Sequence, residues 1–373
     1  MSTNGMPAMA TVALDAMGGD FGLDVVIPAA ALVLKKNRHI HIILVGDEAR
    51  LREHAKTLNV ALSAGEPDYS QNVMSVQHAS EVVEMCDEPA LAVRKKKDSS
   101  MRVAINLVKQ GIAQAAVSAG NTGALMATAK FVLKTLPGIN RPAICTTIPS
   151  VKGHTHMLDL GANVDCSADN LFQFAVMGSV LAEAVDDVRQ PKVGLLNIGS
   201  EDSKGNAQVK SANKLLNTAP INYIGYIEGD DIYLGNVDVV VCDGFVGNVS
   251  LKTSEGVAKM ISFFMKQEFS KGIYNKLSGL LALPVLKAFK KRIDPGTYNG
   301  ASMLGLNGIV IKSHGGADIQ AYANAINIAL LEIKKSVPEH IHSRMAPLLK
   351  TAANADTVKV DATQQAIKEG ESA

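Results

Sequence analysis

Cysteine is scarce in this 373-residue sequence, which contains only four. They are widely scattered, at Cys86, Cys145, Cys166 and Cys242, and none forms a C-x-x-C pair. This spacing argues against a disulfide framework and against a structural zinc motif. It predicts a protein of a reduced, cytosolic compartment.

An excess of charge and a long apolar run are also missing. The formal net charge is +1, which gives no overall attraction to nucleic acids or membranes. No uninterrupted apolar stretch reaches the ~18 residues that span a bilayer, and the first ten residues lack the basic and apolar regions of a signal peptide. We therefore expect a soluble protein, or at most one that lies on a membrane surface.

The sequence does contain a regular alternation of strand-like and helix-like segments. The strand candidates are Thr11–Leu14, Ile40–Val45, Ala115–Ser118, Ala143–Ile148, His156–Leu160, Lys192–Ile198, Ile221–Ile227, Val237–Cys242 and Gly308–Lys312. Several are near-continuous apolar runs, which is typical of parallel strands covered on both faces. The pattern predicts an α/β protein, a doubly wound α/β/α sandwich. We expect one large unit over residues 1–350, which could form two lobes, and a polar, flexible tail over residues 351–373.

Six of the apolar segments end in turns rich in Gly, Asn, Ser and Asp, each followed by a helix-like pattern. The turns are Asp15–Asp20, Ser118–Gly123, Asp159–Asn163, Asn197–Glu201, Asp243–Asn248 and Ser313–Asp318. In α/β sheets ligands bind at the carboxyl ends of the strands, and helix N-termini offer free N–H groups to anions. The turns therefore predict a crevice of backbone donors suited to phosphate. Neither a Walker loop nor a dinucleotide fingerprint is present.

Each turn also has a purely structural interpretation, as a connection stabilised by Asx and capping hydrogen bonds. Ser118–Gly123 is the strongest ligand candidate, because it adds side-chain donors to backbone donors at the start of a helix. The candidate phosphate- and substrate-binding residues are Asp15, Gly18, Gly19, Ser118, Gly120, Asn121, Thr122, Gly123, Arg141, Asp159, Asn163, Asn197, Lys204, Gly244 and Gly247. The candidate catalytic residues are Asn248, His314, Asp243 and Glu201. His314 stands where an acid or a hydrogen-bond donor would be useful, although a lone histidine is more often structural.

Two further segments are candidates for contact with partners. The basic run Arg94, Lys95, Lys96 and Lys97 is either a solvated helix end or a docking patch for an acidic partner. It has no interleaved aromatics, so we do not expect nucleic acid to bind. The segment Lys271–Arg292, within an excursion over residues 262–298, predicts an amphipathic helical hairpin with an apolar tip. This tip either packs in a core or dimer interface or contacts a membrane, through Leu280, Leu281, Leu283, Val285 and Leu286.

The ordered motifs of the chain resemble the bacterial phosphate acyltransferase family of phospholipid synthesis. They are DAMGGD, VRKKKDSS, SAGNTGA, LPGINRPA, LDLGANVD, LLNIGSEDSKGNA, VVVCDGFVGNVSLKTSEG and LNGIVIKSHGGAD, between about Val12 and Val337. The resemblance implies transfer of a long-chain acyl group from acyl carrier protein to inorganic phosphate, and the acyl phosphate would feed glycerol-3-phosphate acylation. It also implies a fold like that of phosphotransacetylase and the isopropylmalate dehydrogenases. The resemblance implies a homodimer as well. It further implies a cytoplasmic protein that associates peripherally with the inner face of the membrane, near a glycerol-3-phosphate acyltransferase.

Within this resemblance we expect no cofactor and no metal. We assign phosphate to Ser118–Gly123 with help from Arg141 or Lys204, the oxyanion or departing thiol to His314 or Asn248, and carrier-protein docking to the basic run. The family pattern usually has two acidic residues after the Asn-Ile-Gly turn, whereas here Ser200 precedes Glu201. Two alternatives stay open, a phosphotransacylase acting on acyl-CoA and a non-catalytic acyl-carrier or lipid-binding scaffold. A metal- and NAD-dependent decarboxylating dehydrogenase is disfavoured, because no spaced set of aspartates is evident.

Overall fold

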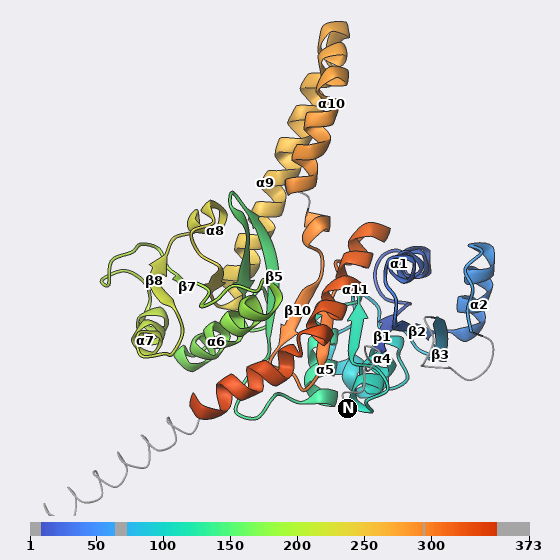
Figure 1. Cartoon of the computed structure of the whole chain (residues 1–373), viewed down its shortest axis with the longest axis horizontal. Coiled ribbons are helices and arrows are strands. Elements are labelled where there is room, and N and C mark those ends of the chain that lie inside the picture. The colour runs from blue at the N-terminus through green and yellow to red at the C-terminus, as the bar shows by residue number, and fades with distance from the viewer. Residues whose placement is uncertain (1–8, 64–72, 294, 349–373) are drawn as a thin grey trace, which may run out of the picture.

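The computed structural model of the chain describes residues 9–63, 73–293 and 295–348. Figure 1 shows its elements, and the predicted tail, residues 351–373, lies outside the described residues. The strands are β1 (Ala10–Asp15), β2 (Ile40–Gly46), β3 (Met74–His78), β4 (Ala115–Ser118), β5 (Ala143–Ser150), β6 (Gly153–Leu158), β7 (Val193–Leu196), β8 (Tyr223–Ile227), β9 (Val239–Val241), β10 (Ala301–Leu304) and β11 (Ile309–Lys312). The helices are α1 (Leu23–Lys36), α2 (Glu48–Thr57), α3 (Pro89–Lys95), α4 (Ser100–Lys109), α5 (Thr122–Leu133), α6 (Ala168–Val185), α7 (Ala207–Leu216), α8 (Asp231–Leu234), α9 (Gly244–Ser270), α10 (Gly272–Ile293) and α11 (Ile319–Lys334), with a 3₁₀ turn η1 (Pro295–Tyr298).

The strands of the described ranges form one eleven-stranded sheet in the order β3-β2-β1-β4-β11-β10-β5-β6-β9-β7-β8. Neighbouring strands are parallel in the first part of this order, β3-β2-β1-β4-β11. They are also parallel in the last part, β6-β9-β7-β8. Between these two sets, β10 is antiparallel to both β11 and β5, and β5 is antiparallel to β6. The predicted strands are all present, whereas β3 and β10 are additions that the sequence pattern did not predict.

Helices cover both faces of the sheet, because alternate residues of a buried strand point to opposite faces. In β1, Val12 and Leu14 belong to the core cluster that includes residues of α1 and α11, and Ala13 belongs to the cluster with α4 and α5. In β9, Val239 packs in the cluster with α6, and Val240 packs on the other side. Each fully buried aliphatic side chain contributes about 1.5–3 kcal/mol to folding. The predicted α/β/α sandwich is confirmed.

The strand directions separate the six predicted turns into two groups. Between β11 and β6 the direction of the sheet reverses three times, at the β11–β10, β10–β5 and β5–β6 pairings. The carboxyl ends of β1, β4 and β11 therefore lie at one edge, and those of β6, β9 and β7 lie at the opposite edge. The expectation that all six turns gather at a single edge is wrong, because it assumed one direction for all of the strands.

Helices α9 and α10 form a hairpin that stands out from the body of the molecule (Figure 1). The segment Lys271–Arg292, predicted as a whole hairpin, forms only the second of these helices. The chain reverses at Lys271, and Gly272 has a φ of 68°, a left-handed conformation that glycine adopts without strain. Pro284 lies inside α10 rather than at a turn. The prediction of an apolar tip around Leu280–Leu286 is therefore wrong in position, since these residues lie along the second helix.

None of the helices in the described residues is both long enough and apolar enough to cross a membrane.

Candidate functional site

Three of the predicted turns, those after β1, β4 and β11, meet at one edge of the sheet. Asp15 stands beside Ser118 in the parallel pairing of β1 with β4, and Ser118 stands beside Lys312 in the pairing of β4 with β11. The turn after β1 also contacts the turn after β11, where the Asp20 N–H donates to the carbonyl of Gly315 at 2.9 Å. We call this group (residues 15–20, 118–123 and 312–318) the three-turn site.

The carboxylate of Asp15 ties parts of the three-turn site together. It accepts hydrogen bonds from the hydroxyls of Ser100 and Ser118, each at 2.6 Å, and Ser118 Oγ in turn accepts from the Gly120 N–H at 3.1 Å. Burial raises the pKa of Asp15, and the bonds from the two serines oppose that effect. A Cβ on Gly18 would lie 2.5 Å from the same carboxylate. The side chains of Asp15 and Ser118 therefore shape these turns by bonds within the protein.

A buried lysine, which the sequence pattern did not single out, ends β11. Lys312 is only 8% exposed, and its Nζ donates to the carbonyls of Ala119, at 3.2 Å, and Ser313. Desolvation lowers its pKa to about 8, and the charges of Asp15 and Asp20 partly oppose that effect. The ammonium thus joins the turn after β4 to the turn after β11 and places a positive charge between them.

The side chain of Asn121 is occupied in shaping the start of α5. Its oxygen caps the helix by accepting from the Ala124 N–H at 3.0 Å. Its amide nitrogen donates to the carbonyls of Met85, at 2.9 Å, and Asp87, at 3.0 Å. Asn121 therefore holds the turn against the segment before α3.

The first two residues of α5 offer the free donors of the three-turn site. Thr122 and Gly123 are exposed, and within the described ranges their N–H groups have no acceptor in the protein. They sit at the positive end of the helix dipole, a position that favours anions. A Cβ on Gly123 would lie 2.8 Å from the ring of Pro89, so glycine lets α3 pack close to this turn.

His314 is an exposed residue on the turn after β11. Its backbone N–H donates to Asn299 Oδ1 at 2.9 Å, and its Nδ1 accepts from the Gly316 N–H at 3.0 Å. This bond places the proton of the neutral ring on Nε2. Desolvation lowers the pKa of His314, so the ring is neutral at pH 7. A neutral imidazole with a free Nε2–H can donate to an oxyanion or to a leaving group.

The turns after β6 and β9 form a second group, at the opposite edge. The carboxylate of Asp159 is fully buried and accepts from the N–H groups of Ile144, Ala162 and Asn163, and from the side-chain amide of Asn163, at 2.7–3.1 Å. The Gly244 N–H donates to the Asn163 carbonyl at 2.8 Å. Burial raises the pKa of Asp159 despite these bonds. Through these hydrogen bonds the Asp159 carboxylate fixes the turn after β6 and the start of β5.

Helix α9 begins against this second group. Asp243 caps it by accepting from the Val246 N–H at 2.9 Å. A Cβ on Gly247 would overlap the carbonyl oxygen of Asp159, so the helix approaches the β6 turn as closely as a backbone can. Asn248 is exposed at the next position of the helix. The Asp159–Asn163 turn therefore meets the start of α9 at the edge opposite to Ser118–Gly123.

Arg141 and Lys204 also lie at the second edge. Arg141 precedes β5, and its Nη1 donates to the Asp165 carbonyl at 2.9 Å. Lys204 follows β7 and bonds through its N–H to the carbonyl of Glu201 at 3.0 Å. Within one chain Arg141 and Lys204 lie at the edge opposite to Ser118–Gly123, and the expectation that either of them assists phosphate bound there stays a prediction.

The turn after β7 is held largely by its own residues. The side-chain amide of Asn197 donates to the Gly199 carbonyl at 3.0 Å. A Cβ on Gly199 would lie 2.7 Å from the carboxylate of Glu201. The Asn197 side chain therefore stabilises this turn from within, and the predicted role of Glu201 stays a prediction.

Helix α9 connects the two groups. It starts at the second group, and one face of it, formed by Lys252, Glu255 and Lys259, lies close enough to His314 to influence its pKa. Lys252 also acts on the pKa of Lys312. These residues follow the i, i+3, i+7 spacing of a single helix face. The three-turn site is therefore bordered by a helix that begins at the second group.

Comparison with known proteins gives this geometry a context. A family model described as "fatty acid synthesis protein" matches residues 10–340. A phosphate acyltransferase from Methylococcus capsulatus is 61% identical over 337 residues, 90% of this chain and 97% of that protein. One from Nitrosococcus oceani is 58% identical over 339 residues, 91% of this chain and 97% of that protein.

The chain belongs to the phosphate acyltransferase family.

The resemblance inferred from the motifs is thereby confirmed, and a solved structure supports the fold of this chain. A phosphotransacetylase from Streptococcus pyogenes superposes with a TM-score of 0.56 at 19% identity, over 87% of this chain and 94% of that chain. At this identity the match shows the shared fold alone.

The basic run, residues 94–97, spans the end of α3. Lys96 is bound within the protein, to Asp87 at 2.5 Å and to the Val82 carbonyl at 2.7 Å. Arg94, Lys95 and Lys97 are exposed. Three of the four predicted docking residues are therefore available to a partner, and Lys96 is a structural residue.

Proposed function

We propose that this chain transfers a long-chain acyl group from acyl carrier protein to inorganic phosphate at the three-turn site. The observation that carries the proposal is the pair of free N–H groups at the start of α5, next to a turn held by a buried ammonium. The family relatives named phosphate acyltransferase support this choice of reaction over the scaffold alternative.

Phosphate is assigned to the Thr122 and Gly123 N–H groups, with the charge of Lys312 behind them. Phosphate is already a nucleophile near neutral pH, so the reaction needs no activated serine or cysteine. Holding it against the thioester carbonyl supplies most of the rate enhancement, through positioning. The three-turn site then acts mainly as a rigid set of donors, as the bonds of Asp15 and Asn121 suggest.

The chemical step forms one bond and breaks another. A phosphate oxygen attacks the thioester carbon to form a C–O bond, and the C–S bond breaks with its electron pair left on sulfur. We assign the Nε2–H of His314 a hydrogen bond to the oxyanion or to the departing sulfur. The thiolate takes the proton that hydrogen phosphate loses on becoming acyl phosphate, and so leaves as carrier thiol. Asn248 keeps its predicted role as an alternative donor, reaching the substrate from the second group.

Release of free carrier thiol from purified acyl carrier protein tests this function. We expect thiol release only when phosphate is present, with one acyl phosphate formed for each thiol. No release in the presence of phosphate favours the scaffold alternative, and release at the same rate without phosphate indicates a hydrolase. Acyl-CoA run in parallel distinguishes the phosphotransacylase alternative, which predicts that CoA is the better donor.

We propose that the exposed basic residues of α3 dock the acidic carrier protein. Changing Arg94, Lys95 and Lys97 together to Glu should raise the KM for acyl carrier protein by about tenfold or more, since three exposed ion pairs of about 0.5 kcal/mol each are reversed. Lys109→Glu, an exposed lysine on α4, is the matched control. An unchanged KM in steady-state assays at low salt would remove this docking site.

We propose that the hairpin contacts the membrane. A groove of about 460 Å³ runs between α9 and α10, lined by Phe269, Leu280 and Leu283 among others. Leu281 is 83% exposed. Burying a leucine side chain stabilises by about 1.5–3 kcal/mol, so contact with an apolar partner would be favourable here. The residues predicted to contact the membrane also include the exposed Val285 and the half-buried Leu286. Such a surface, with lysines nearby, fits a peripheral cytoplasmic protein that delivers acyl phosphate to a membrane glycerol-3-phosphate acyltransferase.

Leu281→Asp should lower the fraction of protein that floats with anionic liposomes by about tenfold. Val151→Asp is the matched control, because Val151 is 82% exposed but lies on the β5–β6 turn. Equal flotation of both variants would contradict membrane contact. A homodimer that dissociates in Leu281→Asp, seen by light scattering, would instead place this surface in the dimer interface.

A further inference from the structure

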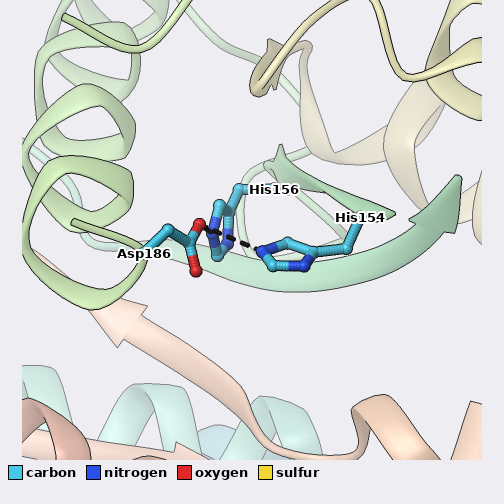
Figure 2. Close-up of side chains that lie close together, drawn as sticks. All are labelled: His154, His156 and Asp186. Atoms are coloured by element: carbon cyan, nitrogen blue, oxygen red, sulfur yellow. Dashed lines mark hydrogen bonds and ion pairs between the residues drawn. The ribbon is translucent and has the colours of Figure 1, made fainter. Parts of the chain in front are cut away.

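Two histidines and an aspartate that belong to none of the residues of the three-turn site converge beside β6 (Figure 2). His154 and His156 lie two residues apart on β6, so both point to the face that α6 covers. Asp186 directly follows α6, and its backbone N–H is fixed to the Ala182 carbonyl at 3.1 Å. The Nε2 atoms of His154 and His156 lie 3.0 Å and 2.6 Å from the same oxygen, Oδ2 of Asp186. The group has no part in the proposed acyl transfer.

The neighbours of His156 orient its ring for a ligand at Nε2. The side chain is 6% exposed, and its Nδ1 lies 3.4 Å from Thr147 Oγ1 on β5. A bond from Nδ1–H to this hydroxyl leaves the Nε2 lone pair pointing at the carboxylate oxygen of Asp186. Two lone pairs facing each other require a proton or a cation between them. Metal-bound histidines characteristically donate their second ring N–H in this way.

The cluster is compact and accessible to an ion. The three ligand atoms lie within 4.8 Å of one another. Ligands about 2.0–2.2 Å from a tetrahedral zinc ion stand roughly 3.3 Å apart, so the two Nε2–Oδ2 distances of 3.0 Å and 2.6 Å must lengthen when an ion enters. The side chains of His154 and Asp186 are 35% and 23% exposed, which leaves an entry path and room for a water as fourth ligand. Strand β6 pairs with β5 and β9 on either side, so the two imidazoles project from a rigid element.

We propose that His154, His156 and Asp186 bind a divalent transition-metal ion, with zinc as the best match. Two imidazoles and one carboxylate are the donor set of open zinc sites, and imidazole selects zinc, cobalt or nickel over the oxygen-preferring magnesium and calcium. The sequence pattern did not indicate this site, because Asp186 is thirty residues from His156 and only the fold brings them together.

Metal binding to the untagged, EDTA-treated full chain tests the proposal. Titration with Zn²⁺ in a calorimeter should give one ion per chain, and Co²⁺ should show the visible absorption of a tetrahedral nitrogen–oxygen site, whereas Mg²⁺ should not bind. His154→Gln, His156→Asn and Asp186→Asn should each abolish this binding, and Thr147→Val should weaken it by about 10–100-fold.

A matched control and a folding check make the outcome decisive. His54→Gln removes a histidine that is also paired with an aspartate, Asp24, at 3.0 Å, and it should retain full zinc binding. The partly exposed His154→Gln variant, folded by circular dichroism, covers the case in which the more buried variants fail to fold. Absence of stoichiometric binding to the wild type, or binding unchanged in folded His154→Gln, would overturn the proposal.

Discussion

Lys312→Met is expected to lower kcat/KM for phosphate by about 10²–10³-fold, the cost of losing one positioned donor in an active site. The ammonium of Lys312 is buried and donates to the carbonyl of Ala119 at 3.2 Å and to that of Ser313. Methionine keeps the length of the side chain but removes the charge and the bonds that hold these two turns together. Lys152→Met is the matched control, because Lys152 is exposed and donates only to Asn236.

The pH dependence separates a role in the reaction from a role in folding. The pKa of Lys312 is lowered to about 8 from its ordinary 10.5, so the ammonium is present below pH 8 and activity should fall above it. Stability changes in the opposite direction. Because the unfolded chain binds more protons than the folded chain between pH 8 and pH 10.5, this lysine makes the fold more stable as pH rises through that range. Loss of activity there is therefore not a loss of folding.

Lys312→Arg tests the same point, because arginine stays charged at every working pH. If this variant is active, its falling limb above pH 8 should disappear. An activity of Lys312→Met within about threefold of the wild type, equivalent to about 0.7 kcal/mol, would contradict the role of Lys312.

Gly247→Ala is expected to destabilise the chain by about 3 kcal/mol or more. A Cβ at this position would overlap the backbone oxygen of Asp159, which cannot move aside like a flexible side chain. Accommodating it requires α9 to move away from the turn after β6, with loss of the buried bonds around Asp159. The free energy of unfolding from urea titration measures the effect.

Gly256→Ala is the matched control, because Gly256 lies in the same helix and a Cβ there would meet nothing within 4 Å. This variant should be more stable than the wild type by about 0.5–1 kcal/mol, since alanine favours the helix interior. Equal stability of the two variants would mean that α9 does not press on Asp159.

Local patterns were sufficient for the elements whose sequences are apolar and continuous. The boundaries of β4 were predicted without error, because Ala115–Ser118 is a short apolar run that ends in a glycine-rich turn. β10 was missed, and Ala301–Leu304 is a strand because β5 and β11 pair with it on either side. Of these partners β11 follows directly, whereas β5 is distant in the sequence.

The candidate site was predicted less completely, because the direction of a strand within the sheet and the burial of a side chain depend on residues that are distant in the sequence. The turns themselves were found, but nothing in a strand sequence reveals that the hairpin of β5 and β6 reverses the sheet. Lys312 was overlooked because a lysine at a strand end is usually exposed. It donates to the Ala119 carbonyl, and the charges of Asp15 and Lys252 influence its pKa, so its surroundings come from three other parts of the chain.

The hairpin shows how a strong local signal misleads. Pro284 removes a backbone donor and commonly ends a helix, which placed the predicted turn near Leu280–Leu286. In the structure the helix continues through Pro284, and the chain turns instead at Lys271 and Gly272, where glycine adopts a positive φ.

A crystal structure of the protein with phosphate tests the central claim most directly. The account predicts phosphate density at the start of α5, with oxygens within hydrogen-bond distance of the Thr122 and Gly123 N–H groups. Density at the start of α9 instead, against the second group and apart from the three-turn site, would contradict it.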